Sequence, residues 1–138
     1  MDEYMKIAIK AAIKAKNNGD VPVGAVVVEK NKVISKAHNK KEHNKNATKH
    51  AEIIAISKAC KKLHSWHLDK CTLYCTMEPC MMCCGAIIQS RIKKVFYLVK
   101  NENYGCTHLL KNSKIEFIEM KDNFYMKQLL NEFFQSKR

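Results

Sequence analysis

Long apolar runs, internal repeats and low-complexity segments are all absent from this sequence of 138 residues. No stretch approaches the roughly 20 apolar residues that a membrane-spanning helix needs. The opening MDEYMKIAIKAA has no apolar core followed by a small-residue cleavage site, so we expect no secretion signal. Hydrophobic residues make up 46% of the chain, which excludes the disordered and fibrous classes. We therefore expect a globular intracellular protein, located in the cytoplasm or the nucleus.

Acidic residues are also scarce. Asp and Glu number 13 against 25 Lys and Arg, which gives a net charge of +12. Such an excess favours a polyanionic partner such as nucleic acid, although a lysine- and asparagine-rich composition gives the same charge without one. The seven cysteines are odd in number and clustered, a pattern more typical of metal ligands and buried thiols than of a disulfide framework.

Periodicity and turn residues predict one domain, residues 1–138, in which helices and strands alternate. Apolar residues at helical spacing predict an N-terminal helix that stops at NNGD, residues 17–20. The expected elements that follow are strands 23–29 and 33–37 joined as a hairpin, a helix capped near Asn46 or Thr48 and ending at Leu63, strand 71–77, a helix from Cys80 to Ser90, strand 93–99, a helical turn near 107–111, strand 115–120 and a C-terminal helix. This order predicts a layered α/β domain with a mixed sheet between helices.

The stretches HAE and PCMMC carry residue types that bind zinc. Cys80 and Cys83 are three residues apart at the start of a predicted helix, so both side chains can grip one ion, with His50 as the third ligand. A helix start and a bound metal both favour thiolate over thiol. Three protein ligands leave a fourth position for a water, whose pKa the metal lowers towards neutrality.

Glu52 follows His50 by two residues and points to a different side of the helix, which favours a proton shuttle over a fourth ligand. His-x-Glu followed by Pro-Cys-x-x-Cys is the signature of the zinc nucleobase deaminases. Taken alone, CMMCC also fits a structural zinc knuckle or a buried helix rich in Met and Cys. Cys84 competes as a ligand, but its spacing departs from the signature, and we expect it to face the core.

Beyond these motifs, the chain resembles the tRNA-specific adenosine deaminases of the cytidine-deaminase-like superfamily. The matching stretches span nearly the whole length and are VPVGAVVV, His38 with Asn39, NATKHAEIIAI, TLYCTMEPCMMCCGAIIQSRI and LLNEFF. The resemblance implies a three-layer α/β/α fold with a central mixed five-stranded sheet, one zinc per chain, and hydrolysis of adenosine to inosine at the wobble position of tRNA anticodons. It implies zinc ligands at His50, Cys80 and Cys83, a general acid/base at Glu52, and a base pocket lined by Asn39, Val21 and the backbone near Met77 and Glu78.

The resemblance also bears on assembly. KNATKHAE and KNENYGC are similar to the catalytic subunit of the eukaryotic two-subunit enzyme, while the bacterial members of the family are homodimers. We therefore expect either a homodimer or a heterodimer with a related, catalytically degenerate subunit. The segment 104–110 departs from the family pattern, because it is short and lacks a run of small residues.

Two other functions remain open on the sequence. A small-molecule deaminase of the same superfamily, acting on guanine, cytosine or deoxycytidylate, would share the EPCMMC motif. A non-catalytic, zinc-containing tRNA-binding subunit would share the ligands, but it would have no use for the carboxylate of Glu52.

Overall fold

The computed structural model describes residues 2–137. Its elements follow in the order predicted from the sequence. They are α1 (Glu3–Asn17), β1 (Gly24–Glu29), β2 (Lys32–His38), α2 (Ala51–Leu63), β3 (Thr72–Met77), α3 (Met81–Ser90), β4 (Lys94–Val99), the short 3-10 helix η1 (Thr107–Leu110), β5 (Glu116–Glu119) and α4 (Phe124–Ser136).

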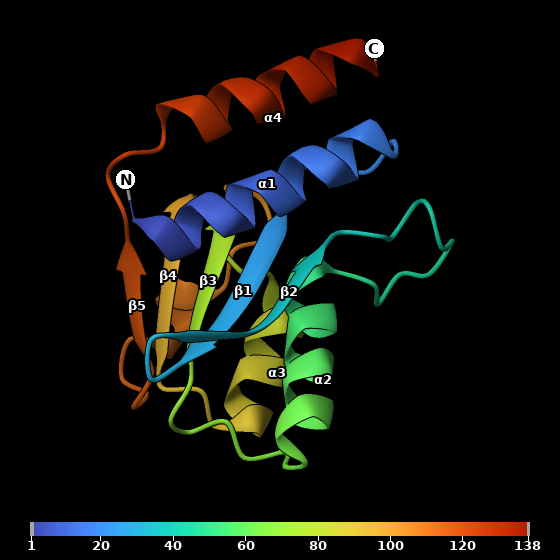
Figure 1. Cartoon of the computed structure of the whole chain (residues 1–138). Coiled ribbons are helices and arrows are strands. Elements are labelled where there is room, and N and C mark those ends of the chain that lie inside the picture. The colour runs from blue at the N-terminus through green and yellow to red at the C-terminus, as the bar shows by residue number, and fades with distance from the viewer. Residues whose placement is uncertain (1, 138) are drawn as a thin grey trace.

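The five strands form one mixed sheet in the order β2-β1-β3-β4-β5. Helices α1 and α4 cover one face and α2 and α3 the other (Figure 1), which confirms the predicted three-layer α/β/α fold. Strands β3, β4 and β5 run parallel to one another, while β1 runs antiparallel to both β2 and β3. The beginning of β1 and the C-terminal ends of β3 and β4 therefore meet at the same edge of the sheet.

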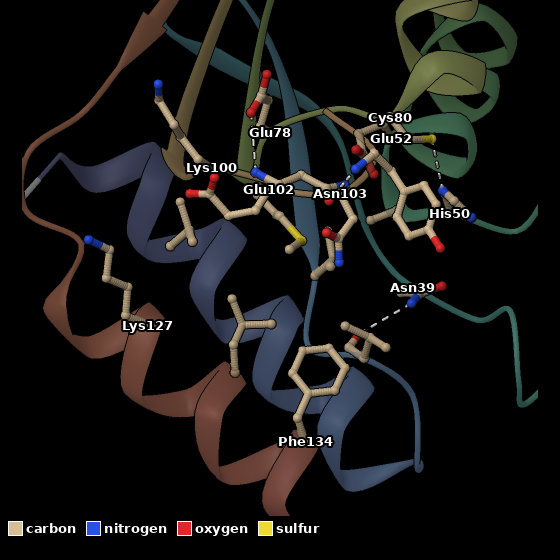
Figure 2. Close-up of a pocket in the computed structure, with 18 of the residues that line it drawn as sticks. Asn39, His50, Glu52, Glu78, Cys80, Lys100, Glu102, Asn103, Lys127 and Phe134 are labelled. Atoms are coloured by element: carbon tan, nitrogen blue, oxygen red, sulfur yellow. Dashed lines mark hydrogen bonds between the residues drawn. The ribbon is translucent and has the colours of Figure 1, made fainter. Parts of the chain in front are cut away.

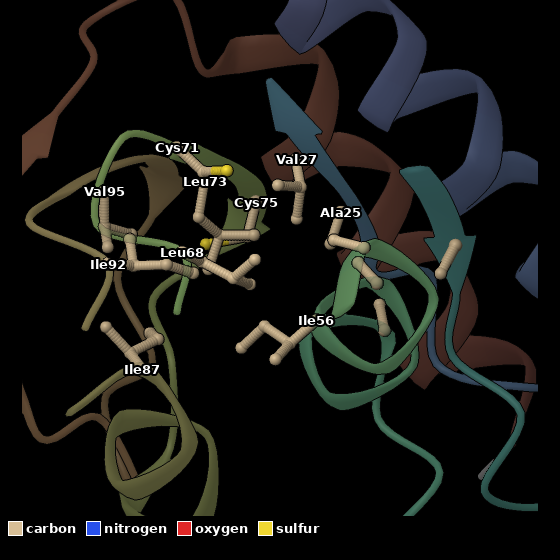
Figure 3. Packing of buried hydrophobic residues seen from close by; sticks show 14 of the residues in the cluster. Ala25, Val27, Ile56, Leu68, Cys71, Leu73, Cys75, Ile87, Ile92 and Val95 are labelled. Atoms are coloured by element: carbon tan, nitrogen blue, oxygen red, sulfur yellow. The ribbon is translucent and has the colours of Figure 1, made fainter. Parts of the chain in front are cut away.

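The sheet is buried on both faces, and this explains the continuous apolar run in β1. Successive side chains of a strand point to opposite faces. Val27 accordingly packs with Ile56 of α2 and Ile87 of α3, as Figure 3 shows, whereas Val26 packs with Met5 and Met126 beneath α1 and α4. No helix within residues 2–137 is long and apolar enough to cross a membrane.

The predicted start of α2 near Asn46 or Thr48 is wrong. The Asn46 side chain instead accepts hydrogen bonds from the backbone N–H and the hydroxyl of Thr48, at 2.9 and 2.7 Å, and so closes a local turn. The helix begins at Ala51, with His50 as the N-cap residue. Short polar side chains often satisfy nearby backbone groups in this way and compete with helix formation.

Candidate active site

Three potential metal ligands meet where α2 and α3 begin. Sγ of Cys80 and Sγ of Cys83 each lie 3.6 Å from Nδ1 of His50, and the two sulfurs are 3.7 Å apart. Zinc bonds of about 2.3 Å to sulfur and about 2.0 Å to nitrogen, set at tetrahedral angles, would place the two sulfurs about 3.8 Å apart and each sulfur about 3.5 Å from the nitrogen. The spacing and the chemistry of the donors therefore fit one zinc ion.

Two of these ligands are N-cap residues. His50 and Cys80 both have extended backbone conformations, with φ and ψ of −76° and 150° and of −79° and 178°. Each precedes the first helical residue, and Cys83 follows in the first turn of α3. The two helix N-termini thus face a common point, and their unpaired N–H groups favour negative charge there.

The protonation of the cysteines follows from these contacts. Hydrogen bonds from Cys83 and from His50 lower the pKa of Cys80 to about 3. The hydrogen bond with Cys80, together with burial, raises the pKa of Cys83 well above the ordinary value of a thiol. The contact with Cys80 raises the pKa of His50. Since a zinc ion binds thiolates, its binding would release the proton that Cys83 keeps here.

Glu52 lies beside this cluster in the first turn of α2, and only 4% of its surface is exposed. Burial raises the pKa of its carboxyl group to about 7. A carboxyl group with such a pKa can both accept and give up a proton near neutral pH. The structure therefore brings together all four residues that the HAE and PCMMC motifs singled out.

A cleft of about 620 Å³ opens from the cluster. Figure 2 shows the side chains that surround it. Val21, Asn39, Met77 and Glu78, the four residues predicted for a base pocket, all line this cleft. Val21 lies just before β1, and Met77 and Glu78 lie at the end of β3, so the sheet edge at which these strands meet forms its floor.

Both ends of the Asn39 side-chain amide are held by backbone groups. Its Nδ2 donates to the carbonyl oxygen of Val21 at 3.3 Å, and its Oδ1 accepts from the N–H of Lys41 at 3.1 Å. An amide side chain has two N–H donors and two lone pairs. One donor and one acceptor therefore remain for a bound molecule, with their direction fixed by these two bonds.

Glu78 lines the cleft, and its side chain also makes a contact that the predicted contribution of its backbone did not include. Its side chain turns to the segment after β4 and accepts hydrogen bonds there from Asn101 and Thr107. No local sequence pattern indicates this contact, because the partners are 23 and 29 residues away along the chain.

Comparisons with known proteins agree with this arrangement. The MafB19-like deaminase family matches residues 1–138. The tRNA-specific adenosine deaminase of Bacillus subtilis is 46% identical over 79% of this chain and 68% of its own length. That of Buchnera aphidicola is 37% identical over 98% of this chain and 94% of its own. The chain belongs to the tRNA-specific adenosine deaminase family.

Solved structures with related sequences are deaminases as well. One, from a study of A-to-I editing by tRNA:A34 deaminases at the wobble position, shares 30% identity over 85% of this deaminase and 96% of the other chain, with a TM-score of 0.79. A guanine deaminase from Bacillus subtilis shares 31% identity over 100% of this deaminase and 94% of its own chain, with a TM-score of 0.70. The recognition of the family and the prediction of a deaminase are both confirmed.

Other cysteines of this deaminase lie outside the cluster. Cys84 is buried, and its thiol points to the carbonyl oxygen of Pro79 at 3.8 Å. Cys75 is fully buried in β3, where burial raises the pKa of its thiol well above the ordinary value. These are packing thiols, as the strand and helix patterns predicted.

Several residues that line the cleft were not assigned to the base pocket from the sequence. Residues 127, 130, 131 and 134 repeat at helical spacing and form one face of α4 that borders the cleft. The apolar stripe of α4 was visible in the sequence, but its neighbouring face became relevant only once α4 was placed beside the sheet edge. The remaining unassigned lining residues are Val23, Lys41, Ala51, Val99, Lys100, Asn101, Glu102, Asn103 and Tyr104.

Proposed function

We propose that this deaminase converts adenosine to inosine at the wobble position of tRNA anticodons, with one zinc ion held by His50, Cys80 and Cys83. The observation that carries the proposal is the spacing of these three donors, which fits tetrahedral zinc, next to a buried carboxyl group in an open cleft. The names of the relatives agree with the proposed substrate.

Zinc bound there would supply Lewis acidity, which lowers the pKa of a water and makes it a nucleophile at neutral pH. Glu52 takes a proton from the water that attacks C6 of the adenine. It gives this proton to the neighbouring ring nitrogen, then takes the remaining proton from the new C6 hydroxyl group and gives it to the departing amine. The new bond joins C6 to oxygen, the C6–N bond breaks, and ammonia leaves. Burial raises the pKa of the Glu52 carboxyl group, which favours its role as a proton acceptor and donor.

The rest of the cleft would hold the base. The free donor and acceptor of Asn39 can pair with the edge of a purine, and the apolar side chains of Val21 and Met77 can pack against its ring. A base reaches this depth only when it leaves its stack, as the unpaired bases of an anticodon loop can do.

The surroundings of the cleft fit a nucleic-acid substrate. Lys41, Lys100 and Lys127 line it. The exposed ring of Phe134 stands at its border, as Figure 2 shows. Lysines near the mouth would contact phosphates, and an exposed aromatic ring offers a surface on which a neighbouring base can stack. A tRNA substrate also agrees with an intracellular location, cytoplasmic or nuclear.

For the assembly we propose a homodimer. The similar enzymes reported above are bacterial, and the family resemblance associates bacterial members with homodimers. A heterodimer with a catalytically degenerate relative is the alternative. Light scattering of the purified chain separates the two, because a homodimer has twice the mass of one chain. A chain that depends on such a partner would not dimerise alone.

The decisive experiment measures inosine at the wobble adenosine of tRNA after incubation with the purified, zinc-loaded chain. Glu52→Gln is the matched control, because it keeps the shape of the side chain and removes its acid/base function. We expect inosine from the parent and none from the variant at equal zinc content. Equal activity of the two proteins would contradict the role of Glu52. No inosine from a zinc-loaded dimer would contradict the proposed substrate.

Guanine is the second candidate substrate, favoured by the similarity to the Bacillus subtilis guanine deaminase along the whole chain. The two functions differ in their dependence on salt. Activity on tRNA should fall steeply as salt rises, since phosphate contacts release counterions. Activity on neutral guanine should change little. Formation of xanthine from guanine without any inosine in tRNA would favour this candidate.

A further inference from the structure

The segment between β4 and η1 forms one wall of the cleft although it contains no regular secondary structure at the cleft itself. Residues 101–104 all line the cleft. The side chain of Tyr104 is 72% exposed, so little apolar packing holds it in place. Hydrogen bonds must therefore contribute much of what fixes this wall.

The carboxylate of Glu78 holds both ends of the segment. Its Oε1 accepts the backbone N–H of Asn101 at 3.2 Å, and its Oε2 accepts the backbone N–H of Thr107 at 3.2 Å and the Thr107 hydroxyl at 2.5 Å. Glu78 is only 7% exposed. Hydrogen bonds to a charged and shielded acceptor are stronger than neutral ones.

The backbone of the same segment also lies against a zinc ligand. Gly105 forms a β-bridge with Cys80, and the N–H of Cys106 donates to the carbonyl oxygen of Pro79 at 3.3 Å. A Cβ on Gly105 would lie 2.5 Å from the Glu78 carboxyl group, so the close approach requires glycine here. The segment is thus tied to the residues just before α3.

We propose that Glu78 is a positioning residue that fixes residues 101–107 as the substrate-binding wall of the cleft. The carboxylate of Glu78 accepts three hydrogen bonds from this segment. The proposed proton transfer belongs to Glu52. Glu78 therefore affects substrate binding only through the position of the segment. The inference rests on the proposed function for its kinetic test, whereas the anchoring itself is tested without activity.

The test compares Glu78→Gln and Thr107→Val with Glu116→Gln. A glutamine at position 78 keeps the shape but turns one acceptor into a donor that faces another donor. Valine at position 107 removes the hydroxyl group but keeps the backbone N–H that donates to Glu78. Glu116 is exposed at the start of β5, so its variant makes the same charge change away from the cleft. Circular dichroism and zinc content show that each variant folds and keeps its site.

Hydrogen exchange is the first measurement. We expect deuterium uptake in the peptide covering residues 101–107 to rise in Glu78→Gln, to rise less in Thr107→Val and to stay at the parent level in Glu116→Gln. Unchanged uptake in Glu78→Gln would overturn the anchoring. This readout needs no substrate, so it separates a failure of this inference from a failure of the proposed function.

Kinetics on tRNA are the second measurement. We expect KM to rise about tenfold in Glu78→Gln, as for loss of hydrogen bonds to a charged group, with kcat within about threefold of the parent. A loss of kcat at unchanged KM would instead place Glu78 in the chemistry and overturn the positioning role. Faster exchange with unchanged KM would show that the segment is no substrate wall. If the parent acted on guanine alone, KM for guanine would decide the same point.

Discussion

Replacing Gly24 with alanine would push a side chain into the backbone of α1. A Cβ built on Gly24 would lie 1.9 Å from the carbonyl oxygen of Ala8 and 2.8 Å from the amide nitrogen of Ala12. Real Cβ atoms essentially never come within 3.0 Å of such neighbours. Helix backbone cannot rotate aside as a flexible side chain can, so α1 must move away from the sheet.

The expected magnitude follows from this contact. Overpacking a core costs about 1–3 kcal/mol, and rigid neighbours bring the cost to the upper end. Displacing α1 also loosens the contacts of Met5 and Ile9, which are 0% and 8% exposed. We therefore expect Gly24→Ala to lower the free energy of unfolding by about 3 kcal/mol.

Gly85→Ala is the matched control. Gly85 lies within α3, and a Cβ there would meet nothing within 4 Å. Alanine is the better helix former, so this variant should gain about 0.5–1 kcal/mol. The same substitution thus has opposite signs at two positions, because only Gly24 touches backbone.

Urea denaturation followed by far-UV circular dichroism measures both variants against the parent. A free energy of unfolding for Gly24→Ala within about 0.5 kcal/mol of the parent, the usual range for harmless surface changes, would refute the close packing of α1 on β1. Val23, the residue just before β1, also lines the cleft. A displaced α1 should therefore raise KM along with the loss of stability.

Three further predictions concern the site, the core and the thiols. Cys83→Ala removes one of the three proposed zinc ligands, so metal analysis should find the zinc content well below one per chain, and full retention would exclude Cys83 as a ligand. Ile87→Ala empties a fully buried position between α3 and the sheet and should cost about 2–5 kcal/mol in urea unfolding; a cost below about 1 kcal/mol would contradict tight packing there. Burial raises the pKa of Cys71 to about 11, so iodoacetamide at pH 8 should alkylate it in unfolded but not in folded protein, as mass spectrometry can check; rapid labelling of the folded protein would contradict its burial.

Local patterns predicted most of the elements. The 3.6-residue period of α1 and α4 and the β-rich runs of β1, β3 and β4 were evident without any structure, because the buried side of each element must be apolar. The hairpin between β1 and β2 followed from a short polar connection, where Lys30 and Asn31 adopt φ of 51° and 62°. The start of α2 was mispredicted, since the Asn46 side chain can either cap a helix or, as here, close a turn with Thr48.

The sequence by itself led to the proposed metal-binding chemistry and the proposed proton carrier. Thiolate and imidazole donors at a short spacing, with a carboxylate two residues from one of them, restrict the possible chemistry before any fold is known. What only the tertiary structure decided is which distant groups complete the cleft. Glu78 reaches Thr107 across 29 residues, and α4 borders the same cleft as α2. Such contacts depend on how the sheet brings its strand ends together, and no local pattern records that geometry.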